Sequence, residues 1–368
     1  MTAITLDQMR PSLYSLEQIR GALAATEPIR AVPFSVGDPI RFRAEPGWHH
    51  GLKALPGEAP VNVFAELGEE YQLTKDAVVE FCNHFKLGKS YVETCPAELL
   101  ALQMNYWFRT GLWGESKSKT ELQFLTSNNI VMALTKQTYQ PFSNLALLEQ
   151  VVSGIQNRFG DVEILADYKS FHDLRQTHLR LIVPDQQRLI HSDLDGDIWS
   201  TGIQIKNSLS GNGQTSIEGY LFRWVCTNGQ IDAKASSGAF TRRRGATEDE
   251  VYAWARESVN EVLGGLESSL DAVQNLTGMR ITGSLTDTMR DLFEHFKIPI
   301  SQRAGIITLL ENYPGEITMY VIMNAITQVA NEQNLDASTV DRLLRIGGEI
   351  PHTVDHRCDS CHRILHSH

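Results

Sequence analysis

The sequence lacks any long run of apolar residues. No stretch of its 368 residues reaches the roughly 18 consecutive apolar residues that a membrane-spanning helix needs. The first 30 residues carry charged or polar groups throughout, so they contain no apolar segment of a secretory signal. We therefore predict a protein with no membrane partner that remains in the cytoplasm of the cell that makes it.

Cysteine is scarce as well. Five cysteines without a predicted secretion signal do not form the dense framework of a disulfide-stapled domain. Cys82, Cys95 and Cys226 are therefore expected to be reduced and buried thiols.

Positive charge is in the minority. Lys and Arg number 33 against 44 Asp and Glu, which gives a formal net charge of -11. The surface as a whole therefore repels phosphate, and contact with nucleic acid would require a local basic patch. This balance argues against indiscriminate coating of DNA.

A recognisable catalytic motif is also missing. The sequence contains neither of the glycine-rich patterns, GxxxxGK[ST] and GxGxxG, that cradle phosphates. Asp193, Asp195 and Asp197 have the spacing of a calcium loop, but such a loop needs Gly and Glu where Ile198 and Gln204 stand. A solvated turn is the better interpretation. These absences favour a protein that is not an enzyme without deciding the question.

What the sequence does contain is an ordinary globular composition with both strand and helix patterns. Hydrophobic residues make up 42% and charged residues 21%. Two strand-like runs flank Asn128 and Asn129, which favours a hairpin, and Thr247 with Glu250 forms a capping box before a long helix. We predict an α+β fold with a central, mainly antiparallel sheet, N-terminal and inserted helices, and a C-terminal helical part.

The same patterns divide the chain into four parts. They are a partly irregular N-terminal segment (1–60), an α+β core domain (61–245), a C-terminal helical region (246–348) and a Cys/His-rich tail (349–368). In the helix that follows Pro96, the spacing predicts a buried face of Leu99, Leu102 and Tyr106, with Trp107 as a further candidate. Gly347 and Gly348 are expected to end the last helix.

The most distinctive stretch runs from Gly202 to Gly245. It combines a strand that ends in Asn-Ser, a Gly-containing loop and the segment RWVCTNG; its distinctive residues are Asn207, Ser208, Gly211, Arg223, Val225, Cys226, Asn228 and Gly229. These residues resemble the family of phage and plasmid proteins called domain of unknown function 932. Segments 74–109, 124–151 and 317–331 are similar to the same family, so the resemblance spans roughly residues 70–335.

The resemblance implies a protein of mobile genetic elements, in a family without an established activity and with a suggested relation to Rad52-like single-strand annealing proteins. We expect an accessory protein of phage or plasmid DNA metabolism that binds single-stranded DNA without a cofactor, promotes annealing in recombination and forms a homo-oligomer. One alternative is a metal-dependent enzyme acting on nucleic acid or nucleotides. Another is a host-interaction protein whose acidic surface is the binding feature.

Arginines form the predicted DNA contact. Arg242, Arg243 and Arg244 are the densest positive cluster, and Arg223 lies on a strand close to them in sequence. Neighbouring polar and aromatic residues complete this prediction: Asn207, Ser208 and Asn212 at a sheet end, and Trp199, Tyr220, Phe222 and Trp224 as stacking platforms. The alternatives are a surface ion-pair cluster with the acidic start of the next helix, turn geometry for the polar loop, and core packing for the aromatics.

The C-terminal tail offers a metal hypothesis. Cys358 and Cys361 have CxxC spacing and are surrounded by histidines. Two of His352, His356, His362 and His366 would complete a tetrahedral zinc set, and His356 and His362 are the predicted pair. This is half of a conventional finger, so a disordered or adventitiously metal-binding tail is an equal alternative. The letters CDSCH also match a haem attachment pattern, which we reject because that chemistry belongs to exported proteins.

Overall fold

The structure is a computed structural model, and the predicted α+β class is confirmed. It describes residues 13–35, 38–46, 61–84, 88, 91–92, 95–110, 121–167, 170–172, 176–191, 197–208, 215–224, 228–240, 247–281, 283–330 and 335–354. Within these ranges the strands form two mostly antiparallel sheets, and helices pack on both. No helix there is both long enough and apolar enough to cross a membrane.

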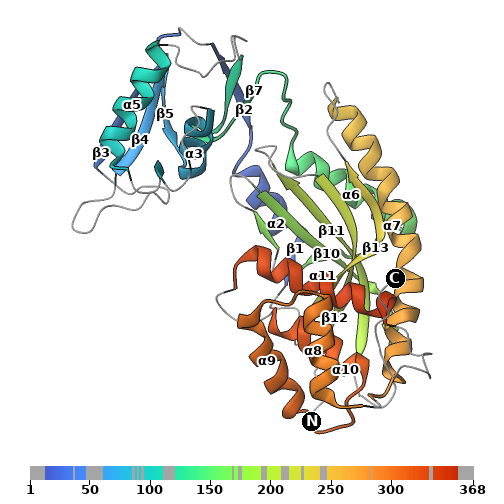
Figure 1. Cartoon of the computed structure of the whole chain (residues 1–368). Coiled ribbons are helices and arrows are strands. Elements are labelled where there is room, and N and C mark those ends of the chain that lie inside the picture. The colour runs from blue at the N-terminus through green and yellow to red at the C-terminus, as the bar shows by residue number, and fades with distance from the viewer. Residues whose placement is uncertain are drawn as a thin grey trace.

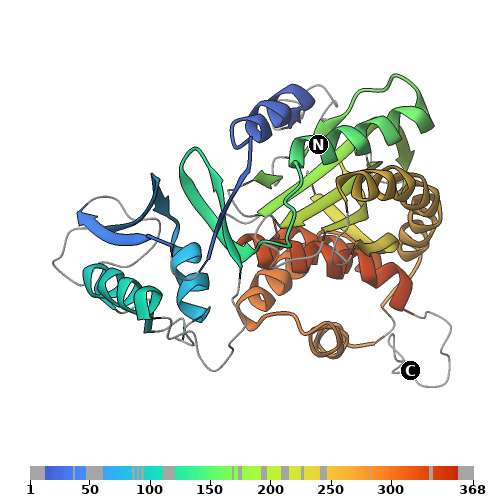
Figure 2. The same cartoon turned by 90° about the horizontal axis from the view of Figure 1, so that it is seen from above.

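The smaller sheet, sheet B, belongs to a lobe that stands apart from the rest of the molecule (Figures 1 and 2). Its strand order is β2-β6-β7-β5-β4-β3, with β5 and β7 parallel. Its apolar side chains and those of helices α3 and α5 form a core of their own. The elements are β2 (Arg30–Phe34), β3 (Arg41–Pro46), β4 (Val61–Leu67), β5 (Glu69–Leu73), α3 (Lys75–His84), α5 (Ala97–Thr110), β6 (Leu122–Ser127) and β7 (Ile130–Lys136).

The predicted hairpin lies at the centre of sheet B. Asn128 and Asn129 adopt φ values of 48° and 61° between β6 and β7, a region that asparagine tolerates better than most residues. The predicted division at residue 60 falls between β3 and β4, which pair with each other along their whole length. The segment expected to be partly irregular therefore supplies two strands of this sheet.

The larger sheet, sheet A, is the centre of the main body. Its strand order is β1-β8-β10-β11-β12-β13, with β9 also paired to β10. The strands are β1 (Tyr14–Ser15), β8 (Leu165–Ala166), β9 (Phe171–His172), β10 (Gln176–Leu189), β11 (Ile198–Ser208), β12 (Thr215–Arg223) and β13 (Asn228–Phe240). The helices of this body are α2 (Leu16–Ala24), α6 (Asn144–Phe159), α7 (Glu248–Thr277), α8 (Leu285–His295), α9 (Ile300–Glu311), α10 (Met319–Val329) and α11 (Ala337–Thr353).

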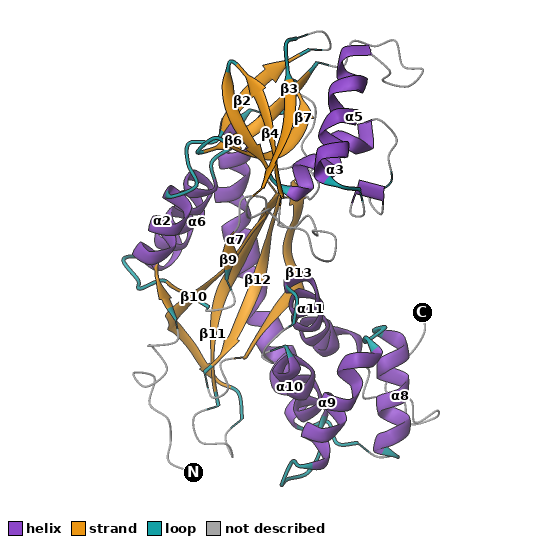
Figure 3. Ribbon diagram, turned by 90° about the vertical axis from the view of Figure 1, so that its left-hand side faces the viewer, coloured by secondary structure: helices purple, strands orange, loops and turns teal. Residues whose placement is uncertain are grey.

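Strand alternation gives sheet A an apolar row next to a polar one. Leu179, Ile205 and Ile217 are direct neighbours across three strands and are buried in the main core. The adjacent row points to the opposite face, because successive side chains of a strand alternate. Helices α6 and α7 cover one side of the sheet and α11 lies on the other (Figure 3).

The polar row consists of Arg180 of β10, Gln204 of β11 and Glu218 of β12. Arg180 donates from Nε to the Gln204 side-chain oxygen at 2.8 Å, and Gln204 donates from Nε2 to Glu218 at 3.2 Å. From α11, Arg345 makes a bidentate pair with Glu218, with both N–O distances at 2.8 Å. Such paired geometry is what offsets the cost of burying these charges.

Asp341 of α11 is the hub of this arrangement. One of its carboxylate oxygens lies 2.5 Å from Lys206 Nζ, and the other accepts from Gln204 at 3.2 Å. Arg180 and Arg345 approach the same carboxylate to 3.8 and 3.7 Å. We refer to the whole group as the buried ion cluster: Arg180, Gln204, Lys206, Glu218, Asp341 and Arg345.

The last helix corrects one prediction. Gly347 and Gly348 do not end it, since α11 continues to Thr353. A Cβ on Gly348 would lie 2.0 Å from the carbonyl oxygen of Ile231 in β13. Glycine therefore serves the close approach of helix and strand rather than a helix stop.

We predict that Gly348→Ala destabilises the protein by about 2 kcal/mol or more, because the new methyl group would have to push α11 off backbone atoms of β13. The control is Gly264→Ala in α7, where a Cβ meets nothing within 4 Å. That change is expected to stabilise by about 0.5–1 kcal/mol through helix propensity. Urea unfolding measures both, and equal effects of the two substitutions would contradict this account of α11.

A second prediction concerns how the stability of the fold depends on the protonation of Asp341. Burial raises the pKa of Asp341, but the charge and hydrogen bond of Lys206, with the charges of Arg345 and Arg180, outweigh burial and hold this pKa below its usual value. A depressed carboxyl pKa stabilises the fold above the unfolded-state pKa of about 4, and this contribution is lost as the pH falls through the folded-state pKa.

Asp341→Asn should therefore lower the free energy of unfolding at pH 7 by about 3 kcal/mol, because it leaves buried cations without their partner. The difference in free energy of unfolding between this variant and the unaltered protein should become smaller below pH 4. Urea unfolding across pH measures this, with Glu261→Gln on the exposed side of α7 as the control. A gap that stayed constant down to pH 2 would show that the charge of Asp341 is not what matters.

Candidate nucleic-acid interface

The structure places Arg223, a predicted DNA contact, in the interior. Its residue is 8% exposed, and its Nε donates to the fully buried Asp197 at 2.6 Å. Its guanidinium carbon also lies 5.4 Å from the ring centre of Tyr320, whose hydroxyl donates to the second Asp197 oxygen at 2.6 Å. A phosphate would have to displace this packing to reach Arg223.

Two further predicted contacts, Asn207 and Ser208, are buried at the end of β11. The Asn207 amide donates to Asn144 at 2.7 Å, and its oxygen accepts from Thr215 at 2.9 Å. The carbonyl of Ser208 accepts from the Tyr139 hydroxyl at 3.3 Å. These residues tie β11 to the start of α6 and to the segment that leads in from sheet B.

The aromatic residues of the strands belong to the core, as the alternative interpretation held. All four are at most 2% exposed: Trp199, Tyr220, Phe222 and Trp224. The indole nitrogens of Trp199 and Trp224 donate inside the protein, to Tyr320 and Ser200. These rings therefore pack the main body and are not available for stacking.

Other predicted site residues lie outside the described residues: Asn212, Arg242, Arg243 and Arg244 for DNA, and His356, Cys358, Cys361 and His362 for zinc. In the part of the chain that the structure describes, no group of three or more His, Cys, Asp or Glu side chains is placed to hold a metal ion. The zinc site stays a prediction. Of the cysteines, Cys82 and Cys95 are free thiols, and burial raises the pKa of Cys82 to about 12.

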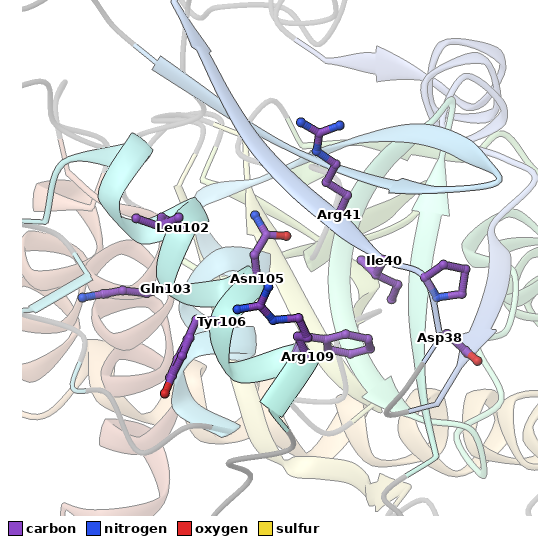
Figure 4. Close-up of a pocket in the computed structure, with 10 residues that line it drawn as sticks. Asp38, Ile40, Arg41, Leu102, Gln103, Asn105, Tyr106 and Arg109 are labelled. Carbon is purple, nitrogen blue, oxygen red and sulfur yellow. The ribbon is translucent and has the colours of Figure 1, made fainter.

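The lobe of sheet B carries an open cavity of about 740 Å³ between β3 and α5 (Figure 4). We call this cavity the α5 groove. The strand side contributes Asp38, Pro39, Ile40 and Arg41, and the helix side Leu102, Gln103, Asn105, Tyr106, Phe108 and Arg109. Sequence reasoning did not select any of these residues as a site.

The groove exists because Asn105 fixes α5 beside the edge of sheet B. β3 is the outermost strand, so the outward N–H and C=O of Phe42 have no strand partner. The Asn105 amide accepts from the Phe42 N–H at 2.7 Å and donates to the Phe42 carbonyl at 2.6 Å. One side chain thus takes the place of a neighbouring strand and closes the exposed edge.

The helix α5 turns an apolar stripe to solvent, and the predicted buried face is wrong. Leu99, Leu102 and Tyr106 are 44%, 65% and 50% exposed. The buried face lies on another side of the helix and consists of Leu100, Ala101, Met104 and Phe108. Apolar residues stand on both sides of this helix, and an exposed apolar patch is a common mark of a binding surface.

Positive charge reaches the groove from both sides. Arg41 comes from β3 and Arg109 from α5, and both are exposed (Figure 4). Among the described residues neither guanidinium is held in an ion pair, whereas Arg43 on the same strand pairs with Glu66. Two cations beside exposed apolar side chains form a surface suited to a ligand that is both anionic and flat.

Comparison of the chain with protein-family models, with curated proteins and with solved structures found no match. The family resemblance described above therefore remains a prediction, and the function has to be inferred from the geometry of the site.

The position of Arg223 gives a third prediction. Arg223→Met should destabilise the protein by about 3 kcal/mol, because it leaves the buried carboxylate of Asp197 without its counter-charge. The double variant with Asp197→Asn should recover part of that loss, since the orphaned charge is then gone. Thermal and urea unfolding measure both. An unchanged free energy of unfolding in Arg223→Met would show that this arginine is not structural.

Proposed function

We propose that the protein binds single-stranded DNA in the α5 groove. The observation that carries this proposal is that two exposed arginines, Arg41 and Arg109, line the same groove as the exposed Leu102 and Tyr106. Guanidinium groups bind phosphate oxygens through planar, charge-assisted hydrogen bonds. Exposed aromatic side chains offer a flat surface to the face of a base.

The apolar part of the groove favours an unpaired strand. In a duplex the faces of the bases are covered by their neighbours, so a double helix presents mainly phosphates, sugars and base edges. A single strand can turn a base onto Tyr106 while its phosphates meet the arginines. The cavity lies within the size range of small-ligand sites, so it would hold about one or two nucleotides as one contact along a longer strand.

The charge of the whole chain limits this binding to a local site. With a formal net charge of -11, most of the surface repels the DNA backbone. In this proposal the protein needs no cofactor, and a homo-oligomer would place several grooves along one strand. That arrangement suits an accessory role in the DNA metabolism of a phage or plasmid, including the annealing of complementary strands.

The fourth prediction tests the groove. The double variant Arg41→Ala and Arg109→Ala should bind a 40-nucleotide single strand more weakly and with a flatter salt dependence. Each phosphate contact contributes about 0.7 to the slope of log affinity against log salt, so the loss should approach about 1.4. Fluorescence anisotropy over a series of salt concentrations measures the slope. The control is Arg290→Ala on α8, an exposed arginine outside the groove.

Two results would contradict the proposal in different ways. If the unaltered protein shows no salt-sensitive binding at roughly micromolar concentration in low salt, it does not bind single strands in the usual nonspecific range. If it binds but the double variant keeps the full slope, the groove is not the site. Replacement of Arg242, Arg243 and Arg244 by Ala then tests the surface that the sequence predicted.

A further inference from the structure

Gln103 of α5 lines the groove beside Tyr106, and its side chain points away from β3 (Figure 4). Tyr91, from the segment before α5, holds the end of its side chain: Gln103 Nε2 donates to the Tyr91 hydroxyl at 2.8 Å, and that hydroxyl lies 3.0 Å from Gln103 Oε1. Both hydrogen bonds lie on the exposed side of the helix. A primary amide in a flexible side chain is therefore held in a defined place beside the cavity.

This amide retains hydrogen-bonding capacity. A glutamine amide has two N–H donors and an oxygen with two lone pairs, and the Tyr91 hydroxyl occupies at most one of each. The other amide of the groove, Asn105, has the same capacity, but it is turned toward the backbone of Phe42. Gln103 can thus offer one donor and one acceptor, side by side, to a ligand.

The position of Gln103 matches the stacking surface. Residues three apart on a helix are surface neighbours, with Cβ atoms about 5–6 Å apart, so Gln103 and Tyr106 form such a pair. A base that lies against the Tyr106 ring would bring its edge within reach of the amide. Base edges present donors and acceptors side by side, whereas a phosphate diester presents acceptors alone.

We propose that Gln103 hydrogen-bonds the edge of an unpaired base in the α5 groove and that Tyr91 is a positioning residue for its amide. This inference rests on the proposed function and adds a division of labour to it: Arg41 and Arg109 hold phosphates, and Gln103 recognises the presence of a base. The groove then distinguishes a nucleobase-bearing strand from a bare polyanion.

The test uses two probes of equal length and charge, a 40-nucleotide single strand and an oligomer of the same backbone in which every base is absent. Gln103→Ala should weaken binding of the base-bearing strand about 5-fold, the loss typical of one or two modest hydrogen bonds, and leave the abasic oligomer unchanged. Tyr91→Phe keeps the ring but frees the amide, so about a 2-fold loss is expected on the base-bearing strand alone. The matched control is Gln156→Ala on the exposed side of α6.

The outcomes separate this inference from the proposed function. Equal losses on both probes, or no loss on either, would overturn base recognition by Gln103 while the protein still binds single strands. A protein that binds neither probe overturns the proposed function and this inference together. Thermal melting of each variant checks that the fold is kept, and we expect this result because the hydrogen bonds between the two side chains lie on the exposed side of the helix.

Discussion

The main body depends on the attraction between one carboxylate, Asp341, and the cations on the polar face of sheet A, Arg180 and Lys206. Strand alternation forces Arg180 and Lys206 onto the face opposite the apolar row, where an apolar helix would leave them unpaired. Helix α11 supplies the countercharge through Asp341. Gly348 allows this helix to lie close enough to β13 for Asp341 to reach these cations. The end of the chain therefore completes a sheet whose strands lie far earlier in the sequence.

The lobe of sheet B does not share this dependence. Its core is separate, and among the described residues it is joined to the main body by hydrogen bonds such as those from the Ser127 hydroxyl to the Thr26 carbonyl at 2.7 Å and from the Tyr139 hydroxyl to the Ser208 carbonyl. Its own constraint is the amide of Asn105, which closes the edge strand and creates the groove in doing so. The buried charges that stabilise the main body and the exposed charges of the groove are thus in different parts of the molecule.

Local signals predicted much of the fold, and the environment of each element decided the rest. The Asn128–Asn129 hairpin and the capping box at Thr247 depend on neighbours in sequence, and both are confirmed. The exposed face of α5 was not predictable from the sequence, because the helix has apolar residues on two sides. Which side is buried depends on how the helix packs on sheet B. The role of Gly348 was predicted wrongly for a similar reason. The sequence alone does not distinguish a glycine that allows a distant strand to approach from a glycine that ends a helix.

Arg223 shows that an arginine in a distinctive sequence motif need not be available to a ligand. Arg223 stands in a distinctive motif, yet a buried aspartate neutralises it, while Arg41 and Arg109 lie far apart in sequence and line one groove. In a protein of net negative charge, such a pair acts only within about 10 Å at 0.1 M salt, beyond which screening and repulsion take over. In the function that we propose, a strand held at so few phosphates would be weakly bound and would keep most of its bases free. Such weak, local binding would suit pairing with a second strand.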